Sequence, residues 1–167
     1  MRVSIIAAVA ENQVIGKDNG LPWYLPADMR HFQNTTKSHH VIMGRKNYLS
    51  IPEKYRPLPE RTNIVVTRRK NYVATGCIVV HSIEQGIERA KNNRETETFI
   101  IGGGEIYKQA LERNLVNKMY ITWVHKQFKG NVFFPEFNKN EWKETERTDY
   151  EPDEKNKHPF SICIYEK

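Results

Sequence analysis

An acidic residue stands among apolar ones at Asp28, in the segment 25–32, which reads LPADMRHF. In a helix, residues three and four positions apart share a face, so the carboxylate lies on one stripe with Leu25 and Phe32. An acid in a first helical turn complements the helix dipole, and that explanation suffices for an arbitrary acid. A carboxylate on an apolar stripe is nevertheless costly unless a partner donates hydrogen bonds to it, so a ligand-binding role competes with the first interpretation.

Three consecutive glycines, Gly102 to Gly104, separate an apolar run from a helical pattern. A glycine backbone can approach a ligand closely, and the N–H groups at the start of the following helix favour phosphate. The turn lacks the spacing of the Rossmann fingerprint and the lysine of a P-loop. A tight turn without a ligand therefore fits this fragment equally well.

Two further apolar runs end in basic pairs, Arg45-Lys46 and Arg68-Arg69. Each pair alone is typical of a solvated surface. Ligands of open α/β sheets bind at the carboxyl ends of the strands. Together with the glycine turn, the two pairs favour a ligand with several phosphates, such as an NADP-type cofactor, which carries one on a ribose.

The segment 19–26, NGLPWYLP, predicts a loop just before Asp28. Such a loop could close over a reaction as a flap anchored by Trp23; an ordinary surface loop whose tryptophan packs on the core is the alternative. The histidines and the two cysteines, Cys77 and Cys163, have no metal-type spacing, and no nucleophile elbow is present. We therefore expect neither a metal nor covalent catalysis, and we expect a reducing, cytoplasmic location.

The remaining sequence predicts elements that position these residues. Runs rich in β-branched residues predict strands at 3–9, 40–44, 62–67, 77–80 and 98–102, and alternating patterns predict strands at 118–124, 142–148 and 160–165. Helical spacing is found at 26–35, 82–92 and 105–114. The expected fold class is α/β, with a mostly parallel central sheet, flanking helices and a C-terminal antiparallel hairpin whose connection, 149–159, is exposed.

The composition limits the class of protein and the kind of partner to be expected. The 167 residues are 38% hydrophobic and 28% charged, which predicts one folded domain over 1–167. A net charge of +6 suits an anionic partner, but the basic residues are scattered among acids, which favours small molecules over nucleic acid. No run approaches the roughly 20 apolar residues that cross a bilayer, and the apolar start, 2–10, is at the short limit for a signal peptide.

In this order, the fragments resemble the dihydrofolate reductase family, particularly its bacterial members. The resemblance runs from Ser4 to Pro135 through IAA (6–8), VIG (14–16), LPW (21–23), LPAD (25–28), VIMGR (41–45), LPER (58–61), IGGG (101–104) and FP (134–135). Any one fragment could be chance, whereas the ordered set is specific. The C-terminal strands carry no diagnostic motif.

The resemblance implies an enzyme that reduces dihydrofolate with NADPH and binds inhibitors such as methotrexate and trimethoprim. Asp28 would bind the 2-amino group and N3 of the pterin, with support from Thr122, while Trp23 helps hold a water; these three are the catalytic candidates. Arg61 would bind the α-carboxylate of the glutamate tail. The substrate-binding candidates are Ile6, Ala7, Asp28, Met29, Phe32, Ile51, Leu58, Arg61, Ile101, Tyr107 and Thr122.

For the cofactor, the resemblance places the nicotinamide beside Ala8, Ile15 and Tyr107, the pyrophosphate at the glycine turn, and the 2′-phosphate near Arg45, Thr67 and Arg68. It also implies a cis peptide between Gly102 and Gly103. The cofactor-binding candidates are Ala8, Ile15, Gly16, Asn19, Gly20, Leu21, Gly44, Arg45, Lys46, Asn47, Val66, Thr67, Arg68, Ile101, Gly102, Gly103, Gly104, Glu105, Ile106 and Tyr107.

Two positions depart from the family pattern. Asn47 replaces a usual threonine at the start of the second helix, and Asn131 replaces an aspartate that helps hold the flap closed in bacterial members. The competing hypotheses are a related pyrimidine reductase of riboflavin synthesis, against which Asp28, Trp23 and Arg61 argue, and a basic nucleic-acid-binding module. By family analogy, we expect a monomer.

Overall fold

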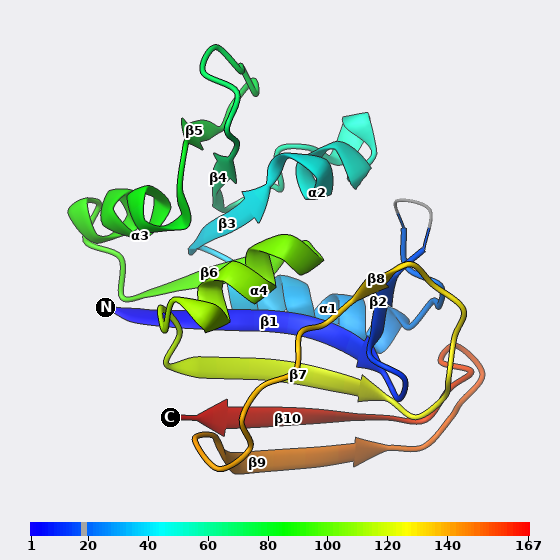
Figure 1. Ribbon diagram of the computed structural model, residues 1–167. Helices are drawn as coiled ribbons and strands as arrows, with labels where there is room; N and C mark the ends of the chain where they lie inside the picture. Colours follow the sequence, from blue (N-terminus) through cyan, green and yellow to red (C-terminus); the bar gives the residue numbers. More distant parts are fainter. Residues whose placement is uncertain (18–19) are drawn as a thin grey trace.

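A computed structural model describes residues 1–17 and 20–167 of the chain. Its strands are β1 (Arg2–Ala10), β3 (His40–Gly44), β4 (Thr62–Val66), β5 (Ile78–Val80), β6 (Glu97–Gly102), β7 (Lys118–Val124), β9 (Lys143–Tyr150) and β10 (Phe160–Glu166). They form one eight-stranded sheet in the order β5-β4-β3-β6-β1-β7-β10-β9 (Figure 1). The six strands from β5 to β7 pair in parallel, whereas β10 pairs antiparallel with β7 and with β9.

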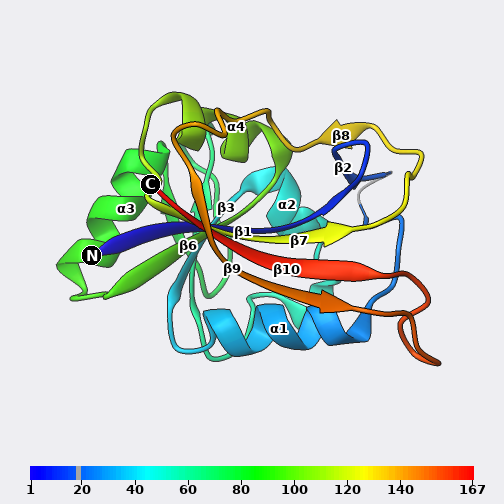
Figure 2. The same cartoon turned by 90° about the horizontal axis from the view of Figure 1, so that it is seen from below.

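The helices are α1 (Pro26–Thr36), α2 (Arg45–Ser50), α3 (Ile83–Asn92) and α4 (Gly104–Glu112), with a 3-10 turn, η1, at Glu53–Tyr55. Two short strands, β2 (Val14–Gly16) and β8 (Val132–Phe133), pair in a separate small sheet. Figure 2 shows α1 on one side of the main sheet and α4 on the other. Within the described residues, no helix is long and apolar enough to span a membrane.

Consecutive residues of the central strands face opposite layers, because side chains alternate across a strand. One core cluster contains Ile5, Ile42, Ile64 and Ile100 with Ile83 of α3 and Ala110 of α4. The other face contributes Ile6, Val41, Met43, Val65 and Phe99, against Tyr48 of α2 and Phe32 of α1. Both faces are covered, which explains why these strands read as continuous apolar runs.

The predicted fold class is confirmed, and each predicted strand and helix is present with its ends moved by at most two residues. Ser82 caps α3, as its side chain accepts a hydrogen bond from the Gln85 amide. The short elements α2, β2 and β8 do not stand out in the apolar pattern, because six, three and two residues are too few to show a period.

Two predictions at the C-terminal hairpin are wrong in detail. Trp142 precedes β9 and packs into the main core with 6% of its surface exposed, so burial of its ring, not strand pairing, explains its apolar character. The connection 149–159 is not wholly exposed either. Strand β9 extends to Tyr150, and Asn156 is only 4% exposed because its amide is hydrogen-bonded inside the protein.

Candidate functional site

The main sheet divides near its centre, where β1 and β6 stop pairing with each other. Strands β1 and β6 pair from Arg2 to Ile5, and the last register pair joins Ile5 with Ile100. Beyond it, β6 continues along β3, with Gly102 opposite Met43, while β1 continues along β7. The carbonyl of Ile6 instead accepts a 2.8 Å hydrogen bond from the hydroxyl of Tyr107 on α4. Two adjacent strand ends are thereby left unpaired with each other, beside the glycine turn.

Asp28 lies in the first turn of α1 and its carboxylate reaches across to β7. The Thr122 hydroxyl donates to Asp28 Oδ1 over 2.6 Å. Burial raises the pKa of Asp28 above its ordinary value, while the Thr122 hydroxyl and the nearby His31 partly offset that rise. A carboxyl group held in a partly desolvated place by one neutral donor still has lone pairs for a ligand with N–H groups.

The structure adds His31, which the sequence interpretation did not use. Its Nε2 is buried and has no hydrogen-bond partner among the described residues, while its Nδ1 lies 3.4 Å from Thr35 Oγ1. Burial lowers the pKa of His31, and the charge of Asp28 partly offsets that. The spacing of three residues from Asp28 on one helix is the sequence signal that could have found it.

The apolar substrate candidates mostly gather on one face of the sheet. That face holds Ile6, Phe32, Ile51, Leu58 and Ile101, all in the cluster that contains Phe99. Ala7 packs against the opposite cluster, and Met29 is 47% exposed. The predicted slot therefore has a wall of five residues, and Met29 is not in the cluster that forms it.

Arg61 sits beside this wall. Its guanidinium carbon lies 5.8 Å from the centre of the Phe32 ring, and its Nη1 donates to Thr36 Oγ1 over 3.2 Å. Its Nε donates to the carbonyl of Pro59. Partial burial lowers the pKa of Arg61, but an arginine remains charged at neutral pH. These contacts hold a cation in a defined place at the edge of the slot.

The cofactor candidates follow three neighbouring strand ends. Gly44 of β3 pairs with Val66 of β4, and Met43 of β3 pairs with Gly102 of β6. Three sets of candidates that lie far apart in the sequence are therefore adjacent: Arg45, Lys46 and Asn47 at the start of α2, Thr67 and Arg68 after β4, and Gly103, Gly104, Glu105 and Ile106 at the start of α4. Thr67 is buried, Arg45 is half-buried, and Lys46 and Arg68 are exposed.

The glycines of the turn meet different requirements. The Gly102–Gly103 peptide bond is cis, as the resemblance implied. Gly103 is the N-cap residue of α4, and a Cβ built on it would meet no atom of residues 1–17 and 20–167 within 4 Å, its chain neighbours aside. A Cβ on Gly104 would lie 2.9 Å from Val132 Cγ1 and 3.2 Å from the Phe133 carbonyl. Gly104 thus allows β8 to pack closely, whereas Gly103 leaves open space at the start of a helix.

The loop before α1 is anchored by its tryptophan. Trp23 is 8% exposed, and its ring centre lies 5.1 Å from that of Phe128, whereas Leu21 is 56% exposed. Gly20 exchanges two backbone hydrogen bonds with Lys17. Ile15 and Gly16 lie on β2, and the Gly16 carbonyl accepts from the Asn131 amide. Asn19, another cofactor candidate, lies outside the described residues.

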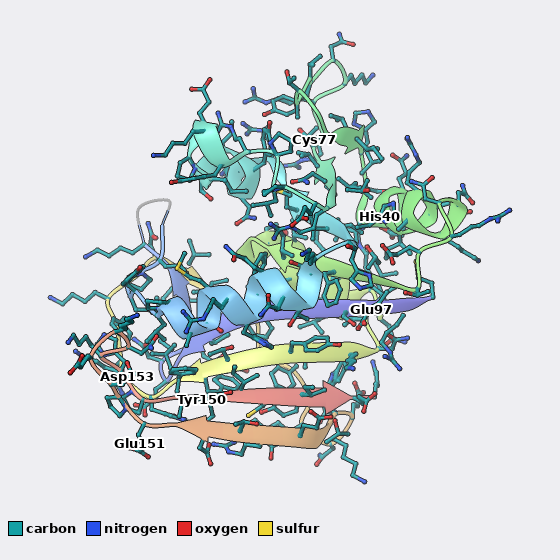
Figure 3. All side chains as sticks on the ribbon, turned by 180° about the vertical axis from the view of Figure 1, so that it is seen from behind. His40, Cys77, Glu97, Tyr150, Glu151 and Asp153 are labelled. Carbon is teal, nitrogen blue, oxygen red and sulfur yellow. The ribbon has the colours of Figure 1, made fainter. Side chains whose placement is uncertain are left out.

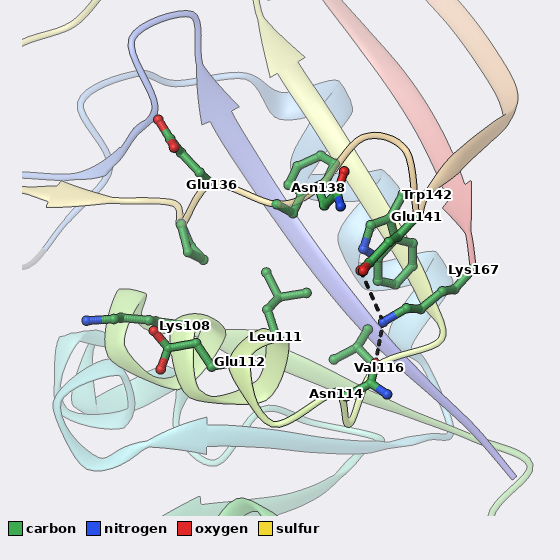
Figure 4. A pocket seen from close by; sticks show the side chains of 12 residues that line it. Lys108, Leu111, Glu112, Asn114, Val116, Glu136, Asn138, Glu141, Trp142 and Lys167 are labelled. Atoms are coloured by element: carbon green, nitrogen blue, oxygen red, sulfur yellow. Dashed lines mark hydrogen bonds and ion pairs between the residues drawn. The ribbon is translucent and has the colours of Figure 1, made fainter.

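A separate hollow of about 370 Å³ lies away from Asp28, between the C-terminal half of α4 and the segment 135–142 (Figure 4). Leu111, Val116 and Trp142 form part of its lining, and Lys167 contacts Glu141 and Asn114 at its edge. None of the predicted site residues line it. In the ranges 1–17 and 20–167, no three histidine, cysteine or acidic side chains gather as a metal ion would require.

Comparisons with known proteins agree with this arrangement. A family model described as dihydrofolate reductase matches residues 2–167. A dihydrofolate reductase of Staphylococcus haemolyticus is 42% identical over 167 residues, which cover all of this chain and 96% of the relative. One of Bacillus subtilis (strain 168) is 39% identical, with 99% and 94% covered.

A solved structure of another protein has a fold similar to that of this chain. The dihydrofolate reductase from Enterococcus faecalis complexed with NADP(H) and RAB-propyl superposes with a TM-score of 0.90 at 33% identity. The alignment covers 99% of this chain and 95% of that one. The likeness therefore extends over nearly the whole of both chains.

Proposed function

The chain belongs to the dihydrofolate reductase family, and on that premise we propose that it reduces 7,8-dihydrofolate to 5,6,7,8-tetrahydrofolate with NADPH as the hydride donor. The observation that carries the proposal is the half-buried Asp28 carboxylate, held by Thr122 beside the unpaired ends of β1 and β6. The end of β6 leads directly into the start of α4, which has open space at Gly103.

On the substrate side, we propose that Asp28 accepts hydrogen bonds from the pterin 2-amino group and N3. A paired, charge-assisted contact fixes the ring in its own plane, and the apolar wall that includes Phe32 and Ile51 excludes water from one side of it. Arg61 then binds the carboxylate of the glutamate tail, because its guanidinium lies over the Phe32 ring of that wall.

On the cofactor side, the residues fit a dinucleotide with an additional phosphate. The N-terminus of α4 offers backbone N–H groups to an anion, and the open space that the described residues leave near a Gly103 Cβ gives room for one. Arg45, Thr67 and Arg68 supply two cations and a hydroxyl at the adjacent strand ends for a 2′-phosphate. When bound, the reduced nicotinamide supplies the hydride.

The chain's own contribution to the reaction is alignment and control of charge. Pterin C6 must face the nicotinamide, and we assign the meeting point of the two rings to the ends of β1 and β6, where their pairing stops. The pterin N5 gains a proton when C6 gains the hydride. Asp28 binds the opposite side of the pterin from N5, so we assign it anchoring and electrostatic support, and assign the proton delivery to a water admitted near Trp23.

The test is a spectrophotometric assay of the purified protein with NADPH and dihydrofolate. The NADPH absorbance should fall, methotrexate should stop the fall, and NADH in place of NADPH should react at least tenfold more slowly. Equal rates with NADH would contradict the assigned role of Arg45 and Arg68. A folded protein that leaves NADPH unchanged would disprove the enzyme assignment.

We extend the proposal to the state of the protein. The first strand, β1, and the last, β10, belong to the same sheet, which supports one domain over 1–167. Cys77 and Cys163 are both unpaired, in keeping with a reducing cytoplasm. By family analogy, the active form is a monomer, and size-exclusion chromatography with light scattering tests this.

A further inference from the structure

Helix α1, which carries Asp28, does not cap its own N-terminus. Its N-cap residue, Leu25, has no side chain that can accept a hydrogen bond, and Pro26 has no N–H group. The first backbone donor of the helix is therefore the amide of Ala27. The side chain of Asn156 accepts that hydrogen bond through Oδ1 over 3.0 Å, from a position 129 residues later in the chain.

The Asn156 side chain is held firmly in this orientation. Its Nδ2 donates to Asp153 Oδ1 and Oδ2 over 3.1 and 3.3 Å. Since the amide nitrogen faces a carboxylate, the amide oxygen must face Ala27. The same Asp153 carboxylate accepts from the backbone amides of Asn156 and Lys155, and the Asp153 amide donates to the Asn156 carbonyl. Asn156 is 4% exposed, whereas Asp153 is exposed, so the Asn156 side chain is shielded from water while the carboxylate that orients it is solvated.

The β9–β10 loop thus meets the start of α1 at a single buried side chain. Figure 3 shows Asp153 at the end of the sheet where α1 begins, and Figure 2 shows the loop at the same end of that helix. The neighbouring loop residues Glu154, Lys155 and Lys157 are exposed. They line an open hollow beside Pro26 and Arg30, so the buried part of the contact with α1 is made by Asn156.

We propose that Asn156 is a positioning residue for Asp28: it fixes the first turn of α1 so that the carboxylate stays against Thr122 and faces the pterin. Ala27, which receives the cap, immediately precedes Asp28, whose Oδ1 lies 2.6 Å from the Thr122 hydroxyl oxygen. A first turn without its cap is less stable, because the Ala27 amide then has no hydrogen-bond partner in the protein and must be hydrated. The effect on turnover rests on the proposed function, whereas the effect on Asp28 itself does not.

The proposal predicts a defined change at Asp28. Opening the first turn admits water to the carboxyl group, whose pKa is now raised mainly by burial, so that pKa should fall towards its ordinary value. His31 on the same helix is the titratable group that acts on Asp28, and the neutral Thr122 is its hydrogen-bond donor. Asp153, the lysines of the loop and Arg30 of α1 are exposed, so solvent screens their charges at Asp28.

The experiment compares Asn156→Ala with a rescue pair. Asn156→Asp alone keeps the acceptor for Ala27 but sets two carboxylates against each other. Adding Asp153→Asn restores a donor facing an acceptor, with the roles exchanged. Glu154→Gln is the control, because this exposed residue lies in the same loop. Circular dichroism establishes that each variant is folded.

We expect Asn156→Ala and Asn156→Asp to raise the KM for dihydrofolate about tenfold with a smaller change in kcat, and to leave the Kd for NADPH within about twofold. Carbon-13 NMR of the Asp28 carboxyl in the ligand-free protein should show a lower pKa in Asn156→Ala, whereas in Asn156→Asp the added negative charge opposes that fall. The double variant should return KM and this pKa to within about twofold and 0.3 units of the unaltered protein, and Glu154→Gln should change neither.

An unchanged Asp28 pKa in Asn156→Ala, or no recovery in the double variant, would overturn the positioning role. If Asn156→Ala does not fold, the comparison of Asn156→Asp with the double variant decides. Failure of the proposed function looks different: the unaltered protein would not oxidise NADPH, while the carboxyl titration would still respond to Asn156.

Discussion

At the scale of single residues, the candidate site depends on one acid whose surroundings disfavour its charge. Burial raises the pKa of Asp28, and a single hydroxyl hydrogen bond and a nearby histidine only partly offset this. Partial burial of an ionised group lowers the folding stability slightly, and the same group is available to bind a ligand. Function and stability should therefore respond in opposite directions when the charge is removed.

Asp28→Asn tests that relation. The amide keeps an acceptor for Thr122 but loses the charge and presents donors to the pterin's donors, so turnover at pH 7 should fall by at least a hundredfold while the Kd for NADPH stays within about twofold. The Tm should be equal or higher, because no ionised group is then desolvated. Steady-state kinetics, fluorescence titration and calorimetry measure the three quantities. Full activity in this variant would refute the anchor role.

Thr122→Val removes the hydroxyl that Asp28 accepts from and keeps a similar shape. The pKa of Asp28 should rise further, because burial is then opposed only by His31. We expect kcat/KM to fall about tenfold, which corresponds to about 1.4 kcal/mol. The pH profile of kcat/KM should move to higher pH, because Asp28 then ionises at a higher pH.

Thr98→Val is the matched control, since that buried hydroxyl donates to the His40 carbonyl on β3. It should lower the Tm and leave the pH profile in place. The same displacement of the profile in both variants would count against a specific effect of Thr122.

At the scale of elements, the glycine turn and the start of α4 act together. Gly103→Ala adds a methyl group that meets no atom of the described residues within 4 Å beyond its chain neighbours, so the fold should tolerate it. The same methyl group would occupy the space assigned to the pyrophosphate. We expect the Kd for NADPH to rise more than tenfold with the Tm within about 2 °C, as measured by fluorescence titration and thermal unfolding.

Gly86→Ala provides the comparison. Gly86 lies on α3, where a Cβ would contact Ile42 and Ile64 at 3.4 Å. Its substitution should alter stability and leave NADPH binding within about twofold. An unchanged NADPH affinity in Gly103→Ala would show that the turn is only a tight connection, which was the alternative interpretation of the sequence.

At the scale of the whole molecule, Glu95 joins segments that lie far from the candidate site. Its side chain is 7% exposed, and it accepts hydrogen bonds from the His40 amide and Nδ1, both over 2.7 Å, and from His39 Nδ1. These bonds outweigh the effect of burial and lower the pKa of Glu95 to about 2 from 4.5. The stabilisation is complete above the unfolded value of 4.5 and is lost as the pH falls from there towards 2.

Glu95→Gln should therefore lower the free energy of unfolding by about 2 kcal/mol at pH 7, where several charge-assisted bonds are lost. The difference from the unaltered protein should shrink as the pH falls from 4.5 to 3. Urea unfolding at a series of pH values measures both. Glu84→Gln, which removes an exposed ion pair with Arg113, should cost less than about 0.5 kcal/mol at every pH. A constant difference across the pH series would contradict the assigned pKa.

Local pattern was enough for the main elements and for many of the candidate residues. Alternation of apolar side chains determines which segments become strands, and it places Ile5 and Ile6 on opposite faces. The acid on the apolar stripe and the triple glycine are both local, so the sequence alone marked them. The short elements and the exact ends of β9 were not predictable, because two to six residues carry too little periodic signal.

Only the tertiary structure determines which residues distant in the sequence contact one another. The end of the pairing between β1 and β6, the hydrogen bond from Thr122 to Asp28, and the cap that Asn156 gives to Ala27 each join segments about a hundred residues apart. A single sequence shows which residue types are present, but a polar residue in a charged loop reads as solvated. Burial of Asn156 follows only from where the loop packs, and the site's electrostatics follow from that burial.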